Sequence, residues 1–126
     1  MTYMGTEYYP AWLDKLAADV TLEAPAMNGV VQGAEAVHAI VDYARTLYDN
    51  QEFSYVGAFG DNGFVEDYTA EVRGEPTRVI VVVTSNAAGK TQRIVVNHRP
   101  RSSLLVFSHA MGEKFGGEHF LVTEPF

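Results

Sequence analysis

The sequence contains no cysteine, few basic residues and no long hydrophobic run. Without cysteine, disulfides, thiolate nucleophiles and cysteine-ligated metals are excluded. Nine Lys and Arg against sixteen Asp and Glu give a formal net charge of −7. This balance argues against nucleic acids and anionic membrane surfaces as partners, because both are bound by clustered positive charge. The longest aliphatic run, residues 79–83, is far too short to span a bilayer.

The first ten residues also lack the features of a secretory signal. They carry neither a basic start nor an apolar stretch, so a cytoplasmic location is expected. The length of 126 residues fits one domain, and a hydrophobic fraction of 47% is typical of a globular protein. We predict a single domain over residues 1–126, with its core at about residues 10–116.

The periodicity of the sequence changes twice between Trp12 and Val41. Apolar residues first recur at helical spacing, then alternate with polar ones as in a half-buried strand, and then return to a helical stripe. Asn28-Gly29, before the second helix, is a hairpin signal. These patterns predict a short helix from Pro10 to Ala17, a strand from Asp19 to Ala24, and a long helix from Ala34 to about Asn50, where Asn can take a left-handed cap.

Four strand-like stretches follow, separated by short turns rich in Gly, Asn and Pro. Short turns between successive strands predict an antiparallel meander. The third stretch is apolar on both faces, so it is expected to be central and covered on both sides. The predicted strands are residues 52–59, 63–73, 78–86 and 91–99.

The two ends of the chain give weaker patterns. Residues 1–9 show no periodicity and are expected to form a loose lead-in. Residues 102–108 resemble a strand or a loop, and residues 109–115 a short helix that ends at Gly116-Gly117. The tail from Glu118 onward predicts no structure.

The order of these elements, together with four short motifs, resembles the nuclear-transport-factor-2-like superfamily and, within it, the SnoaL-like group. The resemblance implies an α+β fold in which a curved antiparallel sheet wraps around helices as a cone, the cystatin-like architecture, with a pocket inside. It also implies a homodimer that pairs through the outer face of the sheet. The motifs lie between about Trp12 and Phe115: Leu16-Ala17-x-Asp19-Val20-x-Leu22-x-x-Pro25, Gly33-x-x-x-Val37, Ala88-Gly89-Lys90 and His98-Arg99-Pro100.

Relatives usually carry a longer helix upstream of the position of Trp12, and here only about ten residues precede Pro10. Either this lead-in supplies a stub of the wall, or that side of the pocket is open, which would leave the pocket shallow or covered by the C-terminal tail or a partner subunit. The steroid isomerases of this fold use two carboxylates, and the matching positions hold Ala24 and Val81. Proton abstraction by that route is therefore not expected, since a general base must reach the proton.

The family register places Glu66, Tyr68 and His98 on the inner face of the sheet. A carboxyl group in an apolar pocket has a raised pKa, and histidine titrates near neutrality. Glu66 and His98 are therefore candidates for an acid–base pair, with Tyr68 as an oxyanion donor. The alternative is a structural hydrogen bond between Glu66 and His98.

Ligand-binding candidates for the pocket wall are Trp12, Tyr55, Val81 and Val96, since small-molecule sites are mostly apolar and aromatic. No His or carboxylate cluster has metal-ligand spacing, and no dinucleotide or phosphate-loop motif occurs, so neither metal nor cofactor is expected. On the outer sheet face, the predicted dimer-interface residues are Asp67, Asn97 and Arg99, with Asp67 pairing with Arg99; the alternative is a solvated face.

The predicted function is the binding of a small, largely apolar organic molecule in the cone. Whether catalysis accompanies binding stays open between a cofactor-free acid–base enzyme and a non-catalytic dimeric binding or assembly module. A third alternative is a cone that is filled by its own side chains.

Overall fold

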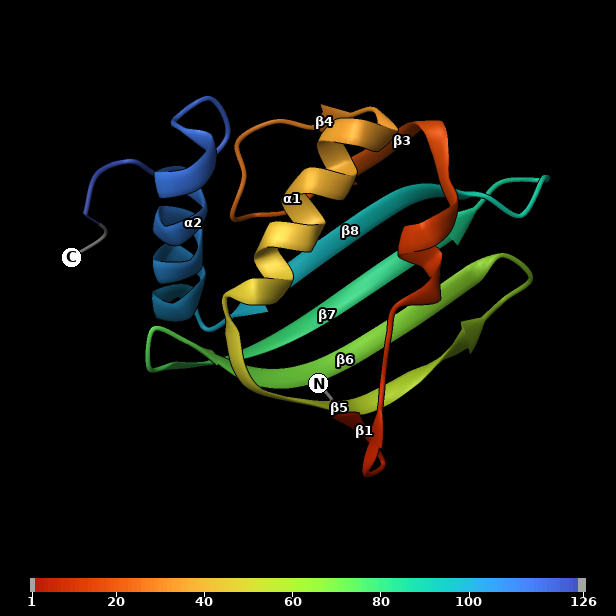
Figure 1. Cartoon of the computed structure of the whole chain (residues 1–126), viewed down its shortest axis with the longest axis horizontal. Coiled ribbons are helices and arrows are strands. Elements are labelled where there is room, and N and C mark those ends of the chain that lie inside the picture. Colours follow the sequence, from red (N-terminus) through yellow and green to blue (C-terminus); the bar gives the residue numbers. More distant parts are fainter. Residues whose placement is uncertain (1, 125–126) are drawn as a thin grey trace.

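Residues 2–124, which the computed structural model describes, form one curved eight-stranded sheet and two α-helices (Figure 1). Helix α1 lies across the concave side of the sheet, and α2 lies beside it near the C-terminus. The strand order is β2-β1-β5-β6-β7-β8-β3-β4. In chain order the elements are β1 (Thr2–Tyr3), β2 (Thr6–Glu7), the 3₁₀ helix η1 (Ala11–Lys15), β3 (Leu16–Glu23), β4 (Val31–Gln32), α1 (Ala34–Thr46), β5 (Tyr48–Phe59), β6 (Gly63–Val72), β7 (Glu75–Ser85), β8 (Thr91–Arg99) and α2 (Arg101–Phe115).

The predicted α+β cone and its antiparallel meander are confirmed, because β5 to β8 pair in sequence order. The sheet as a whole is mixed, however, since β1 pairs with β5 and β3 with β8 in parallel. The two edge strands, β2 and β4, are each two residues long. The meander therefore forms the middle of the sheet, and the segments that precede it extend both sides.

The boundaries of the elements before and after α1 differ from the predicted ones. The short helix is only η1, and β3 starts at Leu16, three residues before the expected strand, with a register irregularity between Leu16 and Thr21. Helix α1 ends at Thr46, and Asn50 lies within β5. Asn50 does take a left-handed conformation (φ 53°), but at a shift in strand register between Asp49 and Glu52. The apolar spacing that predicted a helix up to about Asn50 thus continues into strand β5.

Residues 101–115 form one continuous helix, so the prediction of a strand or loop at residues 102–108 was wrong. Ser103 and Ser108 are fully buried on this helix, which hides its apolar stripe in the sequence. Both hydroxyls have partners: Ser103 donates to Thr77 and Pro100, and Ser108 donates to the carbonyl of Ala26. The predicted stop is correct, since Gly116 takes a positive φ of 84°.

Residues 2–9 are not a loose lead-in. They form the β1–β2 hairpin, which pairs with β5 through Thr2 and Tyr3. The chain then passes into η1, which places Tyr8 and Trp12 against the inner side of the sheet, where both contact Glu66. Of the two alternatives for this wall, the structure therefore favours the one in which the lead-in supplies a stub of it.

The core lies between the inner face of the sheet and the helices. Val79, Val81 and Val83 of β7 are buried on this inner face. Ile80 and Val82, on the other face of β7, are only half-buried. The expected cover on both sides of this strand is therefore missing on the outer face, within the part of the chain that the structure describes.

Candidate functional site

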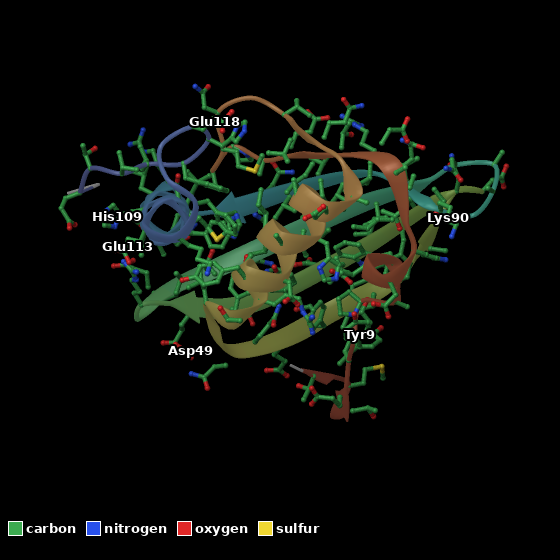
Figure 2. All side chains as sticks on the ribbon, turned by 45° about the horizontal axis from the view of Figure 1, so that its top comes forward. Tyr9, Asp49, Lys90, His109, Glu113 and Glu118 are labelled. Atoms are coloured by element: carbon green, nitrogen blue, oxygen red, sulfur yellow. The ribbon has the colours of Figure 1, made fainter. Side chains whose placement is uncertain are left out.

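A cavity of about 70 Å³ lies inside the cone, between the inner face of the sheet, α1, η1 and the segment that follows α2. Most of its lining is apolar. Figure 2 shows side chains between α1 and the sheet. By volume it holds roughly five to seven waters or one compact organic molecule. The alternative of a completely filled cone is therefore wrong. The polar lining residues are Arg45, Tyr48, Gln51, Glu66, Tyr68 and His98.

Glu66 of β6 is the buried acid of this cavity, with 3% of its surface exposed. Its Oε2 accepts hydrogen bonds from the hydroxyl of Tyr8 (2.5 Å) and from the indole Nε1–H of Trp12 (2.9 Å). Burial raises the pKa of Glu66, while the two hydrogen bonds and the positive charge of Arg45 act in the opposite direction. Burial and the bond to Glu66 in turn raise the pKa of Tyr8.

The two oxygens of Glu66 have different surroundings. Both hydrogen bonds end on Oε2, and Oε1 accepts none from the described residues. Oε1 is also not among the fully enclosed polar atoms that lack a partner. Since Glu66 lines the cavity, Oε1 is the oxygen that faces it. Oε1 therefore keeps its lone pairs available for a proton or for a molecule bound in the cavity.

His98 of β8 is also buried, with 4% of its surface exposed, and its ring stacks on Phe107 of α2. Burial lowers its pKa from 6.5 to about 4, so the imidazole is neutral near pH 7. Its Nε2 is 2.7 Å from the hydroxyl of Tyr48, and its Nδ1 has no hydrogen-bond partner among the described residues.

The predicted trio of Glu66, Tyr68 and His98 does face the cavity, as the register required. A direct Glu66–His98 pair does not form, whether as an acid–base pair or as a structural hydrogen bond. Glu66 is bonded to Tyr8 and Trp12, and His98 to Tyr48. Tyr68 lies between them, with its ring 5.4 Å from that of Tyr48. Burial, Tyr48 and Glu66 together raise the pKa of Tyr68.

Three of the four predicted wall residues line the cavity: Trp12, Val81 and Val96. Tyr55 does not; it is 49% exposed on the outer side of β5. A shift of register between Phe53 and Tyr55 breaks the alternation of side chains there. Phe53 is buried in the cavity wall while Tyr55, two residues later, points away from it.

On the outer face of the sheet, Asp67 pairs with Arg78 of the neighbouring strand (3.1 Å). The predicted Asp67–Arg99 pair is therefore wrong within the chain, because β7 lies between the strands that carry these two residues. Asn97 and Arg99 are exposed. Their assignment to a dimer interface stays a prediction.

Several polar residues of the site escaped the sequence analysis: the lining residues Arg45, Tyr48 and Gln51, and Tyr8, which is bonded to Glu66. Tyr8 lies in a segment without periodicity, and Tyr48 fits the apolar stripe of α1 although it begins β5. The only local signal for the first is the Met4-Gly5 turn between β-forming residues. Nothing in the sequence indicates that either phenol meets a buried partner on a distant strand.

The described residues contain no group of three or more His, Cys, Asp or Glu side chains that could hold a metal ion. Among these residues there is also no helix long and apolar enough to cross a membrane.

The chain has the fold of nuclear-transport-factor-2-like and SnoaL-like proteins, as the comparison with solved structures shows. A steroid delta-isomerase from Pseudomonas aeruginosa matches with a TM-score of 0.77 and 21% identity, over 83% of this chain and 77% of that chain. An uncharacterized protein with a cystatin-like fold from Silicibacter pomeroyi DSS-3 matches with a TM-score of 0.75 and 18% identity, over 82% and 72% of the two chains. A putative isomerase of the SnoaL-like family from Agrobacterium tumefaciens matches with a TM-score of 0.52 and 16% identity, over 71% and 78%.

At these identities the likeness establishes the fold and not the reaction. No family model and no curated protein matches the sequence. Ala24 and Val81, which stand where the resemblance implies the two carboxylates of steroid isomerases, both line the cavity. The cavity thus has apolar side chains at those two positions and its buried acid, Glu66, on a different strand.

Proposed function

We propose that this protein binds a small, mostly apolar organic molecule in the cavity and transfers a proton to or from it through Glu66. The observation that carries this proposal is the free Oε1 of a buried carboxyl group facing an apolar cavity. Glu66 is held from behind by Tyr8 and Trp12, so its orientation is fixed before a ligand enters. No cofactor is needed for a proton shift of this kind.

The chemistry that fits is removal of a proton from a carbon next to a carbonyl group, followed by its return at another position. The raised pKa of Glu66 makes it a stronger base than an exposed carboxylate, which suits this role. The negative charge then develops on the carbonyl oxygen and needs a hydrogen-bond donor. Tyr68, which lines the cavity, is the donor for this oxygen, since the hydroxyl of Tyr48 is already bonded to Nε2 of His98. Isomerases among the proteins of similar fold support this class of reaction.

Binding can be tested by filling the cavity. Ala44 of α1 lines the cavity, whereas Ala39 on the same helix is exposed. With a panel of small cyclic ketones as probes, we expect Ala44→Phe to weaken binding by roughly tenfold or more. Ala39→Phe carries the same side chain with the same helix propensity and is expected to bind like the wild type. Equal affinities in all three proteins would show that the ketones bind elsewhere.

Proton transfer can be tested without knowing the natural substrate. A ketone that binds is incubated in heavy water, and exchange of the hydrogens next to its carbonyl is followed by NMR. We expect exchange to be catalysed by the wild type and lost in Glu66→Gln, which keeps the acceptor for Tyr8 and Trp12 but cannot take a proton. Binding without exchange in the wild type would leave the protein a binding module.

That second function, binding without turnover, is favoured by one observation. The positions of the two isomerase carboxylates hold Ala24 and Val81, so the cavity lacks the known pair of acids. The two functions share the cavity and differ only in the role of Glu66. The exchange experiment separates them directly.

We also propose that two copies pair through the outer face of the sheet. Val65, Ile80, Val82 and Val95 form a half-buried aliphatic strip across β6, β7 and β8. Arg93 and Arg99 are exposed on the same face of β8, on either side of Val95. An apolar centre with a charged rim is the usual composition of a protein interface.

A further inference from the structure

The segment of residues 116–124 folds back from the end of α2 and closes one end of the cavity. Phe120 is 6% exposed and lines the cavity together with Met27 and Met111. The sequence predicted no structure for this segment, and it contains neither helix nor strand. It nevertheless contributes a buried aromatic ring, that of Phe120, to the cavity wall.

Hydrogen bonds to two neighbouring elements fix the segment in place. The backbone N–H of Asn28 donates to the carbonyl of His119 (2.7 Å), and the N–H of Leu121 donates to the hydroxyl of Ser108 (3.1 Å). The same hydroxyl donates to the carbonyl of Ala26 (2.6 Å). Ser108 therefore ties α2, the loop after β3 and the C-terminal segment together.

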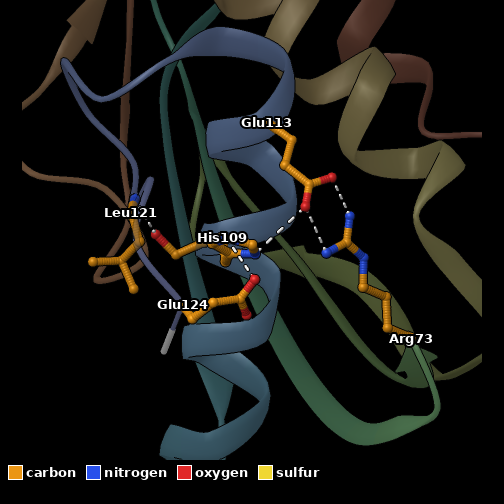
Figure 3. Close-up of polar contacts among 6 residues, drawn as sticks. Arg73, His109, Glu113, Leu121 and Glu124 are labelled. Carbon is orange, nitrogen blue, oxygen red and sulfur yellow. Dashed lines mark hydrogen bonds and ion pairs between the residues drawn. The ribbon is translucent and has the colours of Figure 1, made fainter. Parts of the chain in front are cut away.

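Helix α2 also carries a glycine, Gly112, at the point where this segment packs against it. A Cβ atom on Gly112 would overlap the carbonyl oxygen of Leu121, so only glycine allows the two backbones to approach so closely. Glycine within a helix costs about 1 kcal/mol relative to alanine, and close contact with the segment offsets this cost. At the outer surface, His109 of α2 lies 3.8 Å from Glu124 and 3.5 Å from Glu113 (Figure 3).

The segment differs from the rest of the cavity wall in how it is anchored. The other walls are strands of the sheet, α1, α2, η1 and the loop after β3. The segment, by contrast, exposes Glu118 and Val122 and depends on a few hydrogen bonds and one buried ring. Parts of a protein with few buried apolar contacts open locally at lower free energy than the core.

We infer that residues 118–121 are the gate of the cavity, and that Phe120 determines the length of ligand the cavity accepts. This inference rests on the proposed binding of a small apolar molecule. With the gate in place, the cavity of about 70 Å³ accepts compact ligands only. Without the Phe120 ring, the cavity extends toward solvent along α2, and longer ligands fit while their polar group stays at Glu66.

Trp12 offers a direct readout, because it is the only tryptophan of the chain and lines the cavity. The probes are straight-chain alcohols from butanol to decanol, whose hydroxyl can donate to Glu66. We expect the shorter alcohols to bind the wild type and change its tryptophan fluorescence. The longer alcohols should not bind and should leave the fluorescence unchanged. In Phe120→Ala the longest accepted alcohol is expected to be longer. Val122→Ala removes an exposed side chain of the same segment and is the control, expected to match the wild type.

Gly112→Ala tests the gate without changing the cavity lining. The added methyl group displaces Leu121, so we expect faster amide exchange in residues 118–121. We also expect Gly112→Ala to bind longer alcohols than the wild type does, as Phe120→Ala should. Exchange in the strands β6 to β8 is the internal control for folding, and it should stay slow. Faster exchange at the segment with an unchanged length limit would overturn the gate.

The outcomes separate this inference from the proposed function. If alcohols bind the wild type and Ala44→Phe blocks them, but Phe120→Ala leaves the length limit unchanged, the binding proposal stands and the inference fails. If no alcohol changes the fluorescence of the wild type or of Phe120→Ala, both fail. A shifted limit in Phe120→Ala and Gly112→Ala, with Val122→Ala unchanged, supports both.

Discussion

Burial acts on Glu66 and His98 in opposite directions. It raises the pKa of the glutamic acid and lowers that of the histidine, because both groups are driven toward their neutral forms. At a sufficiently high pH the same cavity is lined by a charged Glu66 and a neutral His98.

Replacing Glu66 by Gln is expected to stabilise the protein at neutral pH. A raised pKa means that the folded state is favoured while Glu66 is protonated, and that this contribution is lost as the pH rises through the folded-state pKa. Each unit by which the pKa is raised corresponds to about 1.4 kcal/mol. Thermal unfolding of the wild type and Glu66→Gln over a range of pH should show a gain that disappears below the unfolded-state pKa. A gain of equal size at all pH values would contradict it.

His98 is expected to stay neutral well below the usual pKa of histidine. Its pKa is lowered to about 4, so its contribution to stability is complete above 6.5 and is lost as the pH falls toward 4. Lowering a pKa from 6.5 to about 4 corresponds to about 3 kcal/mol. The imidazole resonances in NMR spectra should show no titration of His98 near 6.5.

At the level of elements, strand β5 marks the limit of what periodicity can predict. The predicted start at residue 52 lies four residues inside the observed strand, because Tyr48 also fits the helical stripe of α1. Two irregularities of register follow, at Asp49/Glu52 and Phe53/Tyr55. Each changes which side chains point inward, and neither leaves a pattern in the sequence. The outward direction of Tyr55 could therefore not be predicted.

The bulge at Asn50 can be tested by substitution. Asn50 has a φ of 53°, a conformation that asparagine and glycine tolerate and β-branched residues do not. We expect Asn50→Val to reduce the free energy of unfolding by about 1–3 kcal/mol, and Asn50→Gly to leave it nearly unchanged. Urea denaturation measures both. The exposed Glu52 of the same strand provides the control, since Glu52→Val should cost little.

The meander and helix α2 show why some elements were easier to predict than others. The strands β6 to β8 alternate regularly and are separated by glycine-containing turns, so their inner residues Glu66 and His98 were correctly placed. In α2 the buried face includes Ser103 and Ser108, whose hydrogen bonds lie far away in the sequence. Because the buried face of α2 mixes serine with phenylalanine, the sequence of this helix shows no clear amphipathic pattern.

At the level of the whole molecule, the proposed dimer predicts a concentration-dependent stability. We expect Ile80→Glu to convert the dimer to a monomer, because a carboxylate in the centre of an apolar interface leaves an unpaired charge. Light scattering after size exclusion measures the mass. Val30→Glu, in an exposed loop away from the outer sheet face, should leave the mass unchanged. A wild type that is monomeric at all concentrations would contradict the dimer.

The two short edge strands have a consequence for how these molecules can aggregate. A long exposed edge recruits further strands by backbone hydrogen bonding, which is the route to fibrils. Here the described sheet ends in β2 and β4, each only two residues long. Neither two-residue strand is long enough to be such a template, but β1 covers β5 only at Glu52 and Phe53, so sideways growth would have to start on the rest of the β5 edge.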